Sequence, residues 1–113
     1  MKNHACAIVI DGHHTDIALK IYSNRVLAVI TQFKKFGTLV VVSRGTVVHE
    51  LNNRTFSTKV LFGKDDIEVV AAARFITEQI DVDKPVLVSI SLKNYDPKTL
   101  KAIAKAVNEI KSW

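Results

Sequence analysis

The sequence predicts an α+β domain in which an antiparallel-rich sheet of about six strands carries two helices on one face. Strand-like runs at residues 26–30, 39–42 and 86–88 are almost continuously apolar, whereas a sheet with one face in water alternates apolar and polar residues. Both faces of this sheet therefore need cover, and two helices can cover only one. The uncovered face predicts a second protein, with a sheet of its own, as the partner.

The length and composition fit one domain spanning residues 1–113, with a formal net charge of +5 and a pI near 9.5. The single cysteine, Cys6, excludes an intramolecular disulfide. The sequence has no signal peptide and no apolar stretch approaching the roughly 18 residues of a membrane span. We therefore expect a cytoplasmic protein, with the nucleus as a further location, and no membrane partner.

The amino-terminal half predicts four strands joined by hairpins, because apolar runs alternate with turn residues. A fifth strand is expected at residues 56–62, after the least patterned stretch, residues 44–55, which we expect to be the most mobile loop. The four hairpin strands are expected at residues 5–11, 16–22, 25–33 and 38–43, with turns at 12–14, 23–24 and 34–37.

The carboxyl-terminal half changes to a helical period. Asp65 and Glu68 form a capping pair before a helix that runs to Ile80. Its apolar stripe is unusually broad, so we expect the helix to be largely buried. A strand at residues 86–92 follows, and Asp96 and Pro97 then supply the cap and first turn of a final helix that reaches Trp113. The extra apolar positions that broaden the stripe of the first helix are Ile67, Val70, Ala71 and Phe75.

No constellation in the sequence predicts catalysis, a cofactor or a metal. His13 and His14, with Asp11 and Asp16 nearby, are the only candidate ligand group. Neighbouring strand residues point to opposite faces, so these imidazoles are expected in an exposed hairpin turn. Cys6 has no cation or helix N-terminus beside it in the sequence, which favours an inert, buried thiol.

A nucleic-acid-binding function is the alternative that the basic composition leaves open. Phe33, Phe36 and Phe56 are interleaved with basic residues that would line one edge of the domain. Small basic dimers bind nucleic acid through such surfaces. The charges are scattered and match no RNP-like or helix-turn-helix pattern. Solvated surface lysines are sufficient to explain them, so we expect no nucleic-acid partner. The basic residues concerned are Lys34, Lys35, Arg44, Arg54, Lys59 and Lys64.

Three segments together resemble the proteasome assembly chaperone 3 family. They read VLAVITQF at residues 26–33, GTLV at 37–40 and TKVLFGKDD at 58–66. The resemblance continues through residues 86–93 into a last helix ending at Trp113, and it leaves out the amino-terminal tip and residues 44–55.

The resemblance implies a non-enzymatic chaperone or adaptor. Family members are expected to fold as a sheet with helices on one face, and two protomers are expected to close a β-sandwich dimer. The implied partners are a second copy of the chain or a proteasome assembly chaperone 4-like subunit, together with 20S proteasome α subunits during assembly of the α-ring.

The dimer interface is predicted on the less apolar face of the sheet, because exchangeable interfaces are more polar than protein cores. The opposite, more apolar face includes Phe62 and is expected to lie beneath the helices. Trp113 is expected to dock on the sheet or the partner. Contact with the proteasome is predicted in the turn that contains Lys34, Lys35 and Phe36, with residues 44–55 as a further candidate. The predicted interface residues are Ser57, Lys59, Leu61, Leu87, Ser89 and Ser91.

Overall fold

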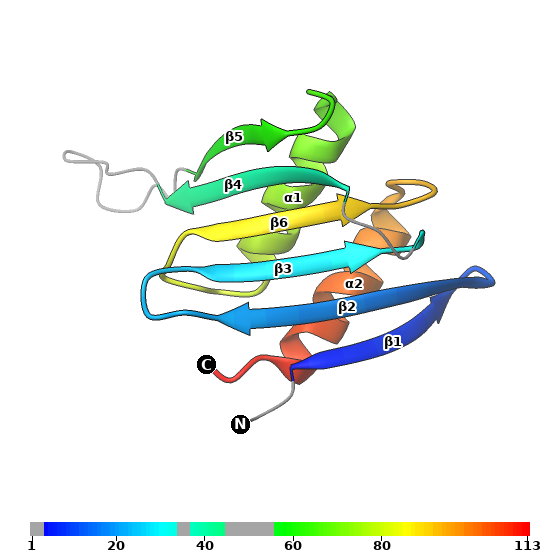
Figure 1. Ribbon diagram of the computed structural model, residues 1–113. Coiled ribbons are helices and arrows are strands. Elements are labelled where there is room, and N and C mark those ends of the chain that lie inside the picture. The colour runs from blue at the N-terminus through cyan, green and yellow to red at the C-terminus, as the bar shows by residue number, and fades with distance from the viewer. Residues whose placement is uncertain (1–3, 34–36, 45–55) are drawn as a thin grey trace.

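Six strands form one mixed sheet with two helices packed on a single side, as the sequence predicts. The computed structural model describes residues 4–33, 37–44 and 56–113. Figure 1 shows both helices behind the sheet, so the side of the sheet that faces the viewer carries no second layer in the described structure. The elements are β1 (Ala5–Ile10), β2 (His13–Ile21), β3 (Val26–Thr31), β4 (Thr38–Arg44), β5 (Phe56–Phe62), α1 (Ile67–Gln79), β6 (Val86–Ser91) and α2 (Pro97–Ile110).

The strand order is β1-β2-β3-β6-β4-β5, so the expected hairpin between β3 and β4 is wrong. Strand β6 lies between them, parallel to β3 and antiparallel to β4. The physical reason is that the runs at residues 26–30 and 86–88 are apolar on both sides of the sheet, so the strands that carry them gain most from its centre. Gly37 fits this order, because a Cβ atom there would lie 2.0 Å from the carbonyl oxygen of Ile90 in β6.

The first hairpin is tighter than the sequence predicts. Its turn is Asp11–Gly12, where both residues have positive φ angles of 48° and 79°, the conformation of a two-residue hairpin loop. His13 and His14 are therefore the first residues of β2 and not part of the turn. His14 Nε2 lies 2.9 Å from Asp16 Oδ1, and the two side chains are 56% and 41% exposed.

The hydrophobic core lies between the sheet and the two helices. Alternate residues of the strands point into it, including Ile17, Ile30 and Ile90, which are at most 1% exposed. Ile76 of α1 and Ile103 of α2 close the core from the other side.

Helix α1 departs from expectation at its cap and on its outer side. Asp66, and not Asp65, is the N-cap residue, and its carboxylate accepts the backbone N–H of Glu68 at 2.9 Å. The broad apolar stripe is only partly buried, because Ile67 is 86% exposed. The sheet covers one side of the helix, so the remaining apolar positions face solvent.

Helix α2 has Asp96 as its N-cap and Pro97 at its start, as predicted, but the Asp96 side chain makes no capping bond. The helix ends at Ile110, so Trp113 is not its last residue. The indole Nε1 of Trp113 donates to the carbonyl of Ile80 at 2.9 Å. Trp113 thus contacts the carboxyl-terminal end of α1.

Candidate functional site

The side of the sheet away from the helices, which we call the open face, has an apolar centre. Opposed residues of a strand pair share a face, so the register gives one row across the sheet as Lys20, Leu27, Leu87, Val41 and Lys59. Three apolar residues thus lie between two lysines. The next row contributes further apolar residues to the centre of the face, namely Ala18, Val29 and Leu39.

A bulge at the end of β5 adds two large side chains to the open face. Val60 pairs with Val40, but Phe62 pairs with Leu39, and the register shifts between Leu39 and Val40. Leu61 is therefore the extra residue of a β-bulge, which re-aims the following side chain. Leu39 is on the open face, so Phe62 is as well, and its predicted place beneath the helices is wrong. Phe62 is 73% exposed and Leu61 is 49% exposed.

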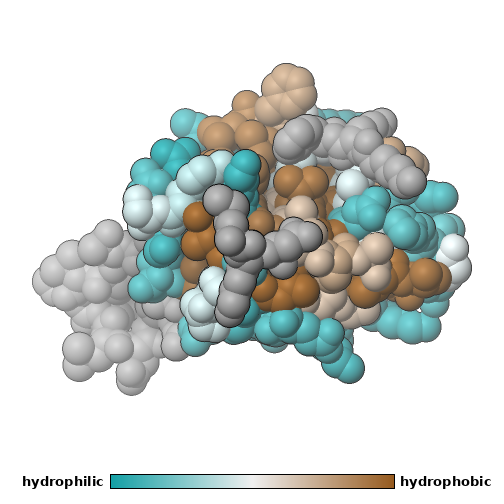
Figure 2. Space-filling view, turned by 60° about the horizontal axis from the view of Figure 1, so that its bottom comes forward, coloured by the Kyte–Doolittle hydropathy of each residue, from teal (hydrophilic) through white to brown (hydrophobic). Residues whose placement is uncertain are grey.

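Large exposed apolar residues call for an explanation when they are contiguous on one surface. In the tilted view of Figure 2, hydrophobic residues reach the surface between hydrophilic ones. Two shallow hollows border Leu87, and Arg25 and Asn24 of the turn between β2 and β3 line both of them. Leu61 and Val41 line one of these hollows, so the apolar centre of the open face is uneven and offers recesses for side chains of a partner.

The structure brings all six predicted interface residues together on the open face. Leu61 and Leu87 are in its apolar part, while Lys59 lies at the β5 margin. Ser89 is only 1% exposed, and its hydroxyl accepts the backbone N–H of Gly37 at 3.2 Å. Ser89 therefore positions the start of β4 and offers little surface to a partner. Ser57 contacts Ser43 across the strands, with 3.1 Å between their hydroxyl oxygens, and Ser91 is opposite Thr31.

Sequence reasoning missed most of the apolar residues of the open face. The prediction considered β5 and β6 alone, whereas the register adds residues from β3 and β4. The signal was present, because alternate positions of the apolar runs at 26–30 and 39–42 must point away from the helices. The missed residues are Leu27, Val29, Leu39, Val41 and Phe62.

Among residues 4–33, 37–44 and 56–113, no group of three or more His, Cys, Asp or Glu side chains is arranged to hold a metal ion. Cys6 is partly buried, and burial together with the nearby carboxylate of Glu109 raises the pKa of its thiol above the usual 9.0. A raised pKa reduces the thiolate fraction and so the nucleophilicity of the sulfur. No helix in the same part of the chain is long and apolar enough to span a membrane.

The predicted proteasome-contact residues Lys34, Lys35 and Phe36 lie outside the described residues, as do residues 45–55. Their role stays a sequence prediction.

The described residues define an α+β domain whose six-stranded sheet is covered by two helices on one side. The model of the family described as Proteasome assembly chaperone 3 matches residues 28–110. A Proteasome assembly chaperone 3 from Nematostella vectensis is 40% identical and aligns with 93% of this chain and 85% of its own length. The human protein of the same name is 28% identical, with 93% and 88% covered. The chain belongs to the proteasome assembly chaperone 3 family.

A solved structure supports the fold. It comes from the crystal structure of a novel chaperone complex for yeast 20S proteasome assembly and superposes with a TM-score of 0.79, covering 97% of this chain and 98% of that one. Only 12% of the residues are identical, so this likeness concerns the arrangement of strands and helices.

Proposed function

We propose that this chain is a non-enzymatic chaperone of 20S proteasome assembly that works as one half of a dimer. Its open face packs against the sheet of a second assembly chaperone, a proteasome assembly chaperone 4-like subunit or a second copy, and the dimer holds α subunits while the α-ring forms. The observation that carries the proposal is the open face, in which Leu27, Val41 and Leu87 form an apolar row between Lys20 and Lys59.

The arrangement suits an exchangeable interface. Sheets pack face to face about 10 Å apart with interdigitating side chains, and the apolar centre of the open face supplies those side chains. Interfaces that form and dissociate keep a polar rim, and serines, lysines and the His14–Asp16 pair surround the centre. Pairing of this kind needs no nucleotide and no covalent step.

The test is sedimentation of the purified chain, alone and mixed with a proteasome assembly chaperone 4 homologue. The wild type is expected to form a dimer in at least one of the two samples. Leu61→Asp places an unpaired carboxylate against the partner, and burying an unpaired charge is strongly unfavourable, so this variant should sediment as a monomer.

Ile67→Asp is the matched control, because it makes the same change at an even more exposed apolar residue on the helical side of the molecule. It should dimerise as the wild type does. A Leu61→Asp variant that still dimerises would remove the open face from the proposal. A wild type that remains monomeric in both samples would refute the pairing altogether.

Contact with α subunits is a separate part of the proposal and has its own variant. Changing Lys34, Lys35 and Phe36 together to Ser should leave the dimer intact and weaken capture of α subunits, because exposed aromatic residues flanked by lysines anchor protein partners. Unchanged capture would place the contact elsewhere. Nucleic-acid binding is tested in parallel by filter binding, where a steep loss of affinity with salt is the signature of phosphate contacts.

A further inference from the structure

The outer side of α1 carries an apolar stripe that the core does not use. Ile67 and Ala71 are exposed, and Val70 and Phe75 are half-buried. Ile67, Ala71 and Phe75 are spaced four residues apart, so they lie above one another on one side of the helix. With 1.5 Å of rise per residue, the stripe is about 12 Å long. It lies on the helical side of the molecule, away from the open face (Figure 1).

Phe75 joins this stripe to a seam between the two helices. It lines a hollow of about 510 Å³ together with Lys101, Ala104, Lys105 and Glu109 of α2. It also lines a predominantly apolar hollow of about 390 Å³ beside Leu100. The hydrogen bond from Asn108 Nδ2 to the carbonyl of Gln79, 3.2 Å long, bridges the helices at one end of the seam. We call this surface the helix seam: Ile67, Val70, Ala71, Phe75, Leu100 and Ala104, with Lys101 and Lys105 at its margin.

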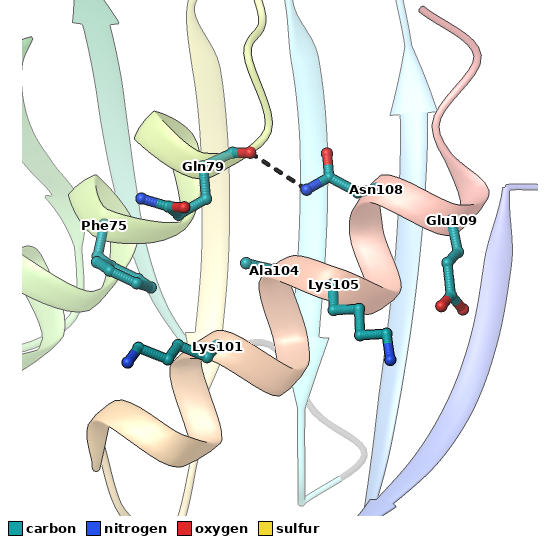
Figure 3. A pocket seen from close by; sticks show the side chains of 7 residues that line it. All are labelled: Phe75, Gln79, Lys101, Ala104, Lys105, Asn108 and Glu109. Carbon is teal, nitrogen blue, oxygen red and sulfur yellow. Dashed lines mark hydrogen bonds between the residues drawn. The ribbon is translucent and has the colours of Figure 1, made fainter.

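At the middle of the helix seam, positive side chains lie without a carboxylate of the described residues in ion-pair contact. Figure 3 shows Phe75 projecting from α1 into the space beside α2, and Lys101 extending from α2 toward α1. Across the described ranges, no ion pair within 4.0 Å involves Lys101 or Lys105. On the α1 margin, by contrast, Arg74 and Glu78 neutralise one another through a contact of 2.9 Å. Within the described part of the chain, two ammonium groups one turn apart thus border an apolar floor without a carboxylate in ion-pair contact.

We propose that the helix seam binds an amphipathic helix of a partner protein, with apolar residues at i, i+3 or i+4 and i+7 and with acidic residues on the side that meets Lys101 and Lys105. Helix-in-groove recognition uses anchors at this spacing, and the two hollows flanking Phe75 accept such anchors. Carboxylates on the bound helix complement the two lysines and also fix its orientation.

A second copy of the chain is a poorer occupant of the helix seam. It would bring its own Lys101 and Lys105 to the contact and would double the uncompensated positive charge, which is unfavourable when charges meet in an interface. The helix seam and the open face lie on opposite sides of the sheet, so both can be occupied at once. The inference therefore goes beyond the proposed function and does not depend on it.

The experiment titrates the purified full-length chain with a fluorescently labelled synthetic peptide and reads the anisotropy. The probe is a helix of about five turns with leucine at i, i+3, i+4 and i+7 and glutamate at most other positions. A second peptide has lysine in place of every glutamate. The wild type should bind the glutamate peptide about tenfold more tightly than the lysine peptide, since two opposite-charge contacts become two repulsive ones.

Charge reversal at the margin of the helix seam tests the role of the two lysines. The double variant K101E/K105E should reverse the preference for the glutamate peptide. The control is K20E/K84E, which makes the same change in net charge away from the helix seam. Lys20 lies on the open face, and Lys84 Nζ donates to the carbonyl of Tyr22 beside the turn between β2 and β3. This control should leave the preference unaltered.

The apolar part is tested separately with Ile67→Ser, which should weaken binding several-fold, and with Val9→Ser as the control. Val9 is 71% exposed, close to the 86% of Ile67, but is on β1. Equal binding of the two peptides, or an unaltered preference in K101E/K105E, would overturn the proposal, as would equal losses in Ile67→Ser and Val9→Ser. The helix seam would instead be assigned to a second copy by two results together. The Leu61→Asp variant would still dimerise, and the double variant L61D/I67S would be a monomer.

Discussion

Gly37→Ala is expected to destabilise the protein severely, because Gly37, directly before β4, lies against the backbone of the neighbouring strand β6. An added Cβ would lie 2.0 Å from the carbonyl oxygen of Ile90, 2.6 Å from its carbonyl carbon and 2.6 Å from Cβ of Ser91. Ordinary C···O contacts begin near 3.3 Å, so the strands would have to separate by about 1.3 Å. Two of the three obstructing atoms belong to the backbone of a central strand and cannot rotate away. The variant would also weaken the bond from the Gly37 N–H to the Ser89 hydroxyl, which is 3.2 Å long.

The expected loss exceeds about 3 kcal/mol, the upper end for overpacking in a rigid core. For a domain of this size, that corresponds to a fall of more than about 12 °C in the midpoint of thermal unfolding followed by circular dichroism. Gly12→Ala is the control, because a Cβ there meets nothing within 4 Å and only the φ angle of 79° is unfavourable. That conformation costs about 1–2 kcal/mol in a residue with a side chain. A Gly37→Ala midpoint equal to or above that of Gly12→Ala would refute the placement of β4 beside β6.

Two smaller effects are expected, one from the Asp66 cap of α1 and one from the Cys6 thiol. Asp66→Ala should lower the free energy of unfolding in urea by about 1 kcal/mol through loss of the α1 cap, while Asp65→Ala should change it by less than about 0.5 kcal/mol; equal losses would mean that both carboxylates cap the helix. Burial and Glu109 raise the pKa of Cys6, so alkylation at pH 8 should be slower in the folded chain than in the urea-unfolded chain, and Glu109→Gln should accelerate it. Since the folded state favours the neutral thiol, this group stabilises the fold below pH 9, and its contribution should disappear as the pH rises above that value. An unaltered alkylation rate in Glu109→Gln would show that the carboxylate does not act on the thiol.

The elements of the fold were predictable, whereas the order of the strands was not. Periodicity and turn residues located six strands and two helices because those signals are local in the sequence. The insertion of β6 between β3 and β4 is a long-range pairing, of Val26 with Val86 and Val42 with Val86. No local pattern in the sequence encodes such a pairing.

The sequence predicted a second apolar face of the sheet, but it identified only some of the residues that lie on that face. Apolar runs in β3, β4 and β6 indicated a second apolar face, and alternation correctly placed Leu61 and Leu87 on it. The bulge that turns Phe62 to the open face depends on the pairing of Leu39 with Phe62, which the sequence of β5 does not reveal. The buried position of Ser89 likewise depends on the neighbouring Gly37 backbone. The sequence also predicted that α1 is largely buried, because its pattern could not show that the sheet covers only one side of that helix.

The central claim is that the open face allows this chain to act in 20S proteasome assembly through a partner. The most direct measurement is the amount of mature 20S proteasome, resolved on native gels, in human cells depleted of their own proteasome assembly chaperone 3 and supplied with this chain. The wild type should restore 20S assembly, and Leu61→Asp, expressed at the same level, should leave assembly intermediates accumulated. Full restoration by Leu61→Asp would contradict the account.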